Sequence, residues 1–195
     1  MSVAERKPGE LMQGERTLSS RRIYDGRILN LRVDDVETAS GQKAVREVIE
    51  HHTAVGVLAV TEKDELLLVR QFRYAVGEET LEICAGLVEE GENLKEAAER
   101  EMQEELGLIP GRLREIGRFY ASPGFCTELL ALFLAEDLRE SKLPQDDDEY
   151  VRAVTISCGE IPSLLAGGAV RDAKTFAALS WLMAWRGLRP VMTER

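Results

Sequence analysis

The stretch that most limits how this chain can fold runs from Gly86 to Leu108 and reads GLVEEGENLKEAAEREMQEELGL. It carries helix signals at both of its ends. Asn93 followed by Glu96 is an asparagine variant of the capping box, and Gly107 is placed to end the helix. We therefore expect a helix over residues 94–106.

Acidic side chains fall on the side of this helix that should face the protein interior. At ~100° per residue, the apolar side carries Leu94, Ala97, Ala98 and Met102. Glu101 and Glu105 lie inside that side, one turn apart, and Glu104 lies at its margin. Like charges at this spacing repel, and burial adds to the cost unless a cation neutralises them. Such carboxylates suit Mg²⁺, which also accepts phosphate oxygens, so the pattern favours a metal site for phosphate chemistry over a solvated acidic helix.

The same stretch fits a known sequence signature at every defined position. The Nudix box is G-x5-E-x7-R-E-U-x-E-E-x-G-U, with U a bulky aliphatic residue, and it is filled here by Gly86, Glu92, Arg100, Glu101, Met102, Glu104, Glu105, Gly107 and Leu108. The chain therefore resembles the Nudix hydrolases, which cleave a diphosphate joined to another group. This resemblance implies an α/β fold, the Nudix α/β/α sandwich with a mixed sheet.

The resemblance also implies roles for the residues of the box. Glu101 and Glu105 are expected to be the principal Mg²⁺ ligands, with Glu104 sharing the metal and Mn²⁺ as a substitute ion. The carbonyl of Ala85, just before the box, is expected to be a backbone ligand. A supporting salt bridge that orients the loop and the helix is expected between Glu92 and Arg100.

Sequences beside the box resemble the ADP-ribose pyrophosphatase branch of the family. LEICAG leads into the box as LE-x-PAG does in that branch, with Cys84 in place of its proline, and YASPGFCTE supplies Pro123 downstream. Glu82 is interpreted as either a further metal contact or a salt-bridge partner. The branch implies hydrolysis of ADP-ribose, or a related ADP-sugar, to AMP and ribose 5-phosphate. The alternatives are a pyrophosphatase for another nucleoside diphosphate sugar, such as GDP-mannose, and a non-catalytic module that senses nucleotide sugars.

The resemblance to this branch indicates which residues contact the substrate. Arg46 in AVREV and Arg73 in RQFR are expected to reach the phosphates or the adenine, because guanidinium groups suit phosphate oxygens. Surface ion pairs are the alternative interpretation for both arginines. Ser122 and Phe125 are expected to line a substrate loop that Glu128 closes, with loop anchoring as their alternative role.

The loop in LPQDDDEYVRA is expected to supply the catalytic base. In the branch that the chain resembles, a carboxylate late in the domain often activates the attacking water. Glu149 matches this position best, Asp147 comes next, and the box residue Glu104 is the remaining candidate. An acidic run of this kind is otherwise a solvated turn.

The order of apolar and polar runs divides the chain into three parts. Residues 1–20 form a polar tail, residues 21–52 predict a small antiparallel β domain, and residues 53–195 form the Nudix domain, with a helix over 174–186. A sheet of this size is marginal by itself. Together with the resemblance, this implies a homodimer through the N-terminal domain, with Arg46 near a composite active site.

Composition and charge exclude several other functions. The chain has 195 residues and a formal net charge of −10, which argues against nucleic-acid binding because backbone affinity needs clustered Lys and Arg. Cys84, Cys126 and Cys158 lack C-x-x-C spacing, so no disulfide framework or zinc site is expected. No apolar leader or membrane-spanning window is present. We expect a cytoplasmic enzyme that binds a small nucleoside diphosphate sugar and neither nucleic acid nor membrane.

Overall fold

The computed structural model describes residues 14–145 and 150–191. They form two compact units, each with its own β-sheet. The smaller unit contains the chain up to His52 together with Tyr120–Glu128, and the larger unit contains Thr53–Phe119 and the chain from Leu129 onward.

The smaller unit is built on three antiparallel strands in sequence order, β1 (Glu15–Asp25), β2 (Leu29–Thr38) and β3 (Lys43–His51). The expected small antiparallel sheet is confirmed. It begins earlier than expected, because residues 15–20 belong to β1 and not to a polar tail. β1 is exposed along nearly its whole length, so its sequence lacks the alternation of apolar and polar residues that identifies a half-buried strand.

The segment Tyr120–Glu128, although distant in sequence, runs beside β3 in the same unit. The N–H of Ile49 donates to the carbonyl oxygen of Phe125 at 2.7 Å, and the N–H of Thr127 donates to the carbonyl oxygen of Ile49 at 2.9 Å. The N–H of His51 donates to Oγ1 of Thr127 at 3.0 Å. These bonds satisfy backbone groups that an edge strand would otherwise leave unpaired.

The larger unit holds a seven-stranded mixed sheet. Its strands are β4 (Ala54–Val60), β5 (Glu65–Arg73), β6 (Glu78–Glu82), β7 (Cys84–Leu87), β8 (Leu108–Tyr120), β9 (Leu129–Glu140) and β10 (Val151–Ser157). The order is β10-β5-β4-β9-β8, while β6 pairs with β5 and β7 pairs with β4. β4 and β9 run parallel, whereas β5 is antiparallel to both β4 and β10. The predicted mixed sheet is confirmed.

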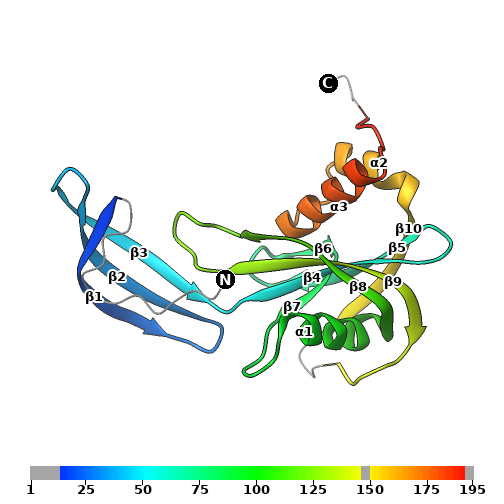
Figure 1. Ribbon diagram of the computed structural model, residues 1–195, viewed down its shortest axis with the longest axis horizontal. Helices are drawn as coiled ribbons and strands as arrows, with labels where there is room; N and C mark the ends of the chain where they lie inside the picture. Colours follow the sequence, from blue (N-terminus) through cyan, green and yellow to red (C-terminus); the bar gives the residue numbers. More distant parts are fainter. Residues whose placement is uncertain (1–13, 146–149, 192–195) are drawn as a thin grey trace. The chain divides into compact units, whose positions relative to one another are not determined.

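Helices cover both faces of this sheet, as Figure 1 shows for the larger unit. On one face lie α1 (Leu94–Glu101) and the π-helical turn η1 (Met102–Leu106); on the other lie α2 (Ile161–Ala166), after the 3-10 turn η2 (Cys158–Glu160), and α3 (Ala173–Trp185).

Each helical layer has a separate apolar core against the sheet. Every residue of β4 is buried, because this central strand contributes side chains to both cores. The predicted α/β/α sandwich is therefore confirmed. No helix within the described ranges is long and apolar enough to cross a membrane.

Candidate metal and phosphate site

The helix that carries the acidic residues forms because both of its ends are capped. The side chain of Asn93 accepts hydrogen bonds from the backbone N–H of Lys95 at 3.0 Å and of Glu96 at 3.1 Å, and Glu96 accepts one from the N–H of Asn93 at 3.1 Å. At the other end Gly107 adopts a left-handed φ of 69°, and its N–H donates to the carbonyl oxygen of Met102. The predicted capping box and glycine stop are confirmed.

Two of the carboxylates on this helix are buried. Glu101 is 7% exposed and Glu105 is 6% exposed, beside the fully buried Ala98 and Met102. The N–H of Ala85 on β7 donates to Oε2 of Glu105 at 3.2 Å, so the helix side chain lies against the strand that precedes the box. The expectation that the apolar stripe contains acids is therefore confirmed.

Gly86 leaves the space that the carboxylate of Glu101 occupies. A Cβ built on Gly86 would overlap with this carboxylate group. Any other residue at this position would push Glu101 away from β7. The first glycine of the signature is thus explained by close packing between the strand and the helix.

Arg100 binds three acidic residues and one carbonyl group of the box. Its Nε donates to Glu92 at 3.0 Å, and its Nη1 donates to Glu101 at 2.7 Å and to Glu104 at 2.8 Å. Its Nη2 donates to the carbonyl oxygen of Leu87 at 2.8 Å. Burial opposes the charge of Arg100, but these acids outweigh it and raise its pKa, while the hydrogen bond from Arg100 lowers the pKa of Glu92. The salt bridge between Glu92 and Arg100 is present as predicted.

The carboxylates of Glu101, Glu104 and Glu105 are of the chemical type that binds a hard divalent cation, although their side chains do not converge on one point. Within residues 14–145 and 150–191, no three His, Cys, Asp or Glu side chains are arranged to hold an ion. Glu101 and Glu104 instead share Arg100, so a cation that binds them competes with this guanidinium group. Carboxylate oxygens held in an apolar layer, with Gly86 providing room for one of them, are the ligands that Mg²⁺ prefers.

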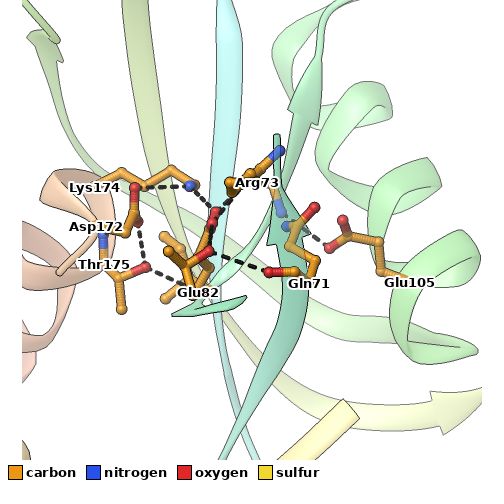
Figure 2. Close-up of polar contacts among 10 residues, drawn as sticks. Gln71, Arg73, Glu82, Glu105, Asp172, Lys174 and Thr175 are labelled. Atoms are coloured by element: carbon orange, nitrogen blue, oxygen red, sulfur yellow. Dashed lines mark hydrogen bonds and ion pairs between the residues drawn. The ribbon is translucent and has the colours of Figure 1, made fainter. Parts of the chain in front are cut away.

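A second charged cluster lies at the end of β6 and joins it to β5 and α3 (Figure 2). Nε and Nη2 of Arg73 donate to the two carboxylate oxygens of Glu82 at 2.8 and 2.6 Å. Lys174 contacts the same carboxylate and lies 3.0 Å from Asp172. Of the two interpretations of Glu82, the structure shows the salt-bridge partner.

Glu82 stays ionised although it is almost fully buried. Burial by itself raises the pKa of its carboxyl group, but the hydrogen bond from Arg73, the charge and hydrogen bond of Lys174, and the hydroxyl of Thr80 lower that pKa to about 2. The hydrogen bond to Glu82 raises the pKa of Arg73 against the effect of burial, and the negative charge of Glu105 adds to this. Arg73 therefore lies within electrostatic reach of the buried carboxylate of Glu105 on the helix.

Gln71 supplies a buried donor beside this cluster. It lies two residues before Arg73 on β5, so both side chains project from the same face of the strand. Figure 2 shows the Gln71 side chain pointing in the direction of Glu105. Its Nε2 is buried and has no hydrogen-bond partner among the residues that the structure describes. A bound oxygen atom would satisfy this group.

Several residues predicted to contact substrate lie in the smaller unit. Nε of Arg46 donates a hydrogen bond to Oε2 of Glu15 at 3.1 Å, and this bond raises the pKa of Arg46. The carbonyl oxygen of Ser122 accepts from the N–H of Phe125 at 3.1 Å, and the Phe125 side chain is 54% exposed. Glu128 lies 4.0 Å from Nδ1 of His51.

The structure thus groups the metal-ligand candidates and Arg73 in the larger unit, and Arg46 with the 120–128 loop residues in the smaller one. Asp147 and Glu149, the expected bases, lie outside the described residues. Sequence reasoning did not find Lys174, Asp172 or Thr175. Asp172 was the available signal, because an Asp before a helical run is a good N-cap, and here it accepts from the N–H of Thr175 at 2.9 Å.

A mixed sheet between two helical layers, with a capped helix that buries two glutamates against it, defines the protein class. A model of the NUDIX domain matches residues 50–179, and a model of the nucleoside diphosphate sugar hydrolase N-terminal domain matches residues 15–49. The chain belongs to the Nudix hydrolase family.

Relatives with known names agree with this assignment. The chain is 37% identical over 177 residues to an ADP-ribose pyrophosphatase of Bacillus subtilis, covering 90% of this chain and 96% of the relative. It is 33% identical over 183 residues to a methanol dehydrogenase activator of Bacillus methanolicus, covering 93% and 98%. A crystal structure of an ADP compounds hydrolase superposes with a TM-score of 0.82 at 23% identity, covering 91% of this chain and 97% of that one, which supports the fold.

Proposed function

We propose that this protein hydrolyses the diphosphate bond of ADP-ribose, or of a related ADP-sugar, to AMP and ribose 5-phosphate in a Mg²⁺-dependent reaction. The buried glutamates Glu101 and Glu105 carry the proposal, because they lie in an acidic group whose arginine, Arg100, is shared by Glu92, Glu101 and Glu104, so that a divalent cation would balance the remaining charge. The similarity to an ADP-ribose pyrophosphatase over 90% of the chain supports the choice of substrate.

The metal ligands proposed are Glu101, Glu104, Glu105 and the carbonyl oxygen of Ala85. These groups would hold Mg²⁺, or Mn²⁺ in its place, and the ion would lower the pKa of a coordinated water and neutralise charge on the phosphoryl oxygens. Glu92 and Arg100 hold the loop and helix in place through their salt bridge. Gly86 lets the helix approach β7 closely enough for these groups to act together.

A loop carboxylate is proposed as the general base that takes a proton from the attacking water. Glu149 is the first candidate, Asp147 the second, and Glu104 the third. A base of this kind acts in the transition state, so its loss lowers kcat more than it weakens binding.

The substrate contacts proposed are Arg46, Arg73, Ser122, Phe125 and Glu128. Arg73 has the strongest support, because one edge of its guanidinium group is held and the group lies near the charge of Glu105. An arginine held in one plane presents its remaining N–H groups to phosphate with little loss of entropy.

We further propose a cytoplasmic homodimer with a strand-rich N-terminal domain over residues 15–52, six residues longer than the expected 21–52, and a Nudix domain over residues 53–195. The cysteines Cys84, Cys126 and Cys158 are all free thiols, which suits a reducing compartment. Exposed apolar side chains on the N-terminal sheet support a partner subunit there, among them Leu18, Ile23 and Tyr24.

The test is a panel assay with Mg²⁺ and purified protein. ADP-ribose, other ADP-sugars, GDP-mannose and related compounds are incubated separately, and released AMP or GMP is quantified by chromatography. The proposal expects AMP from ADP-ribose at the highest kcat/KM. Preferential GMP release would move the assignment to another nucleoside diphosphate sugar. If no nucleotide appears, a sensing module is the better description, and the similarity to the methanol dehydrogenase activator becomes the guide.

A further inference from the structure

Arg73 is held along one edge of its guanidinium group and is open along the other. Nε and Nη2 both donate to the Glu82 carboxylate. Within residues 14–145 and 150–191, Nη1 has no hydrogen-bond partner, and the side chain is 42% exposed while that of Glu82 is 2% exposed. A planar group fixed in this way has one set of donors available for an anion.

Glu82 is in turn held by the first turn of α3. Nζ of Lys174 contacts the Glu82 carboxylate and also lies 3.0 Å from Asp172, the N-cap residue of that helix. The Lys174 side chain is only 13% exposed, so its charge is directed into the cluster and not into solvent. Lys174 therefore spans two carboxylates, one on the helix and one on the sheet.

The charge balance gives Lys174 a role beyond attaching the helix. Arg73 and Lys174 together balance the charges of Glu82 and Asp172. Without Lys174, both carboxylates would act on Arg73 alone, and their excess negative charge would lower the positive potential at its open edge.

Attachment of α3 to the sheet does not need Lys174. Oγ1 of Thr175 accepts from the N–H of Ile83 at 2.8 Å and donates to Asp172 at 2.6 Å, and Thr175 is fully buried. This second connection joins the same turn of α3 to the residue that follows Glu82. The two connections can be separated by mutation.

We propose that Lys174 is a positioning residue that acts through Glu82 on Arg73, fixing the guanidinium plane so that its Nη1 edge receives a phosphate oxygen of a nucleoside diphosphate. The inference rests on the proposed function for the identity of the substrate. It assigns a part in substrate binding to α3, which lies on the opposite face of the sheet from α1 and η1.

A double-mutant cycle tests this inference. The Kd of ADP is measured by titration calorimetry for the wild type, Lys174→Met, Arg73→Gln and the double variant, all in the same Mg²⁺ buffer. Lys174→Met is expected to raise the Kd about tenfold in the wild type and to have no effect in the Arg73→Gln protein, because coupled residues are not additive. An equal increase in both backgrounds would overturn the proposal.

Two further variants separate positioning from folding. Thr175→Val removes the other attachment of α3 and is expected to lower the Tm without changing the Kd of ADP. Lys174→Arg keeps the cation and is expected to bind ADP as the wild type does, which supplies the test if Lys174→Met does not fold. Weak binding by the folded Lys174→Arg variant, or a Kd that follows Tm across all variants, would contradict the proposal.

Kinetics supply the matched control. For ADP-ribose, Lys174→Met is expected to raise KM about tenfold and to change kcat by less than about twofold, since a binding interaction lost equally from ground and transition states affects KM. Lys95→Met makes the same chemical change at a 64% exposed lysine paired with Glu99, and both constants should stay unchanged. An unchanged KM for Lys174→Met would overturn the inference. If the wild type binds ADP but releases no AMP, the proposed function fails, while a non-additive cycle for ADP still supports this inference.

Discussion

Glu82 is a carboxylate that remains charged inside the protein because two cations surround it. Its pKa is about 2, so it gives up its proton more readily in the folded chain than in the unfolded one. A lowered carboxyl pKa stabilises the fold at every pH above the ordinary value near 4.5, and that stabilisation is lost as the pH falls toward about 2.

Glu82→Gln is therefore expected to lower the free energy of unfolding by about 3 kcal/mol at neutral pH, and the difference from the wild type should shrink between pH 4.5 and 2. Urea unfolding at a series of pH values, without Mg²⁺, measures this. Glu115→Gln is the control, because its pair with Arg118 is exposed and should contribute little. A difference that does not vary with pH would contradict the ionised state of Glu82.

The catalytic base is a single carboxylate, and single variants can identify it. Glu149→Gln is expected to lower kcat for ADP-ribose about a hundredfold or more with a small change in KM, and Asp147→Asn should have a weaker effect. Steady-state kinetics at saturating Mg²⁺ measure both. The reverse order would make Asp147 the base, and two small effects would move the role to Glu104.

Individual residues differ in how far the sequence could predict them. Glu101 and Glu105 could be predicted as buried acids, because both positions follow from the helical period alone. The partners of Glu82 could not, because Arg73, Lys174 and Glu82 come from β5, α3 and β6, and no local pattern relates them. Contacts between distant segments depend on how the sheet is assembled.

At the scale of elements, the box helix changes its winding before it ends. α1 is regular from Leu94 to Glu101, and η1 continues as a π-helical turn to Leu106. The N–H of Gly107 bonds to the carbonyl oxygen of Met102, five residues earlier. Wider turns of this type are frequent at functional sites, and this one carries Glu104 and Glu105. The sequence predicted the length of the helix but contains no signal for the wider turn.

Gly107→Ala is expected to destabilise the protein by roughly 1 kcal/mol, because a residue with a Cβ is strained at a φ of 69°. Thermal unfolding measures the loss. Gly117→Ala in β8 is the matched control, since a Cβ there meets no atom within 4 Å and its φ is not positive. Equal Tm values for Gly107→Ala and Gly117→Ala would show that the left-handed end of the helix does not contribute to stability.

Strands were predictable where burial dictates their composition. β4 is buried on both faces and is apolar throughout, so its position was clear from the sequence. β1 is paired on one side and exposed over most of its length, so residues 15–20 gave no apolar pattern to detect. The start of β1 is marked by its backbone pairing with β2 and by the ion pair between Glu15 and Arg46, and neither interaction appears as a local sequence pattern.

At the scale of the whole molecule, the proposed dimer accounts for apolar side chains on the N-terminal sheet. β1 is an edge strand, and Ile23 and Tyr24 on it are 45% and 57% exposed. Sedimentation velocity at micromolar concentration should give a dimer for the wild type, and replacing Ile23 and Tyr24 by Ser should shift it toward monomer. Val76→Ser, at an exposed apolar residue of the larger unit, is the control. A monomeric, fully active wild type would contradict the dimer.

The proposed reaction depends on buried carboxylates of the box helix that act through a divalent cation to cleave ADP-ribose. The most direct measurement compares kcat for AMP release by the wild type, Glu105→Gln and Glu99→Gln as Mg²⁺ is added back after EDTA treatment. The side-chain oxygen of the glutamine in Glu105→Gln can still accept a hydrogen bond from the N–H of Ala85, so the fold is kept while one metal-binding charge is lost. We predict that wild-type and Glu99→Gln activity returns with Mg²⁺, whereas Glu105→Gln stays about a hundredfold or more below them. Near-normal turnover by Glu105→Gln at saturating Mg²⁺, or wild-type turnover that persists in EDTA, would contradict the claim.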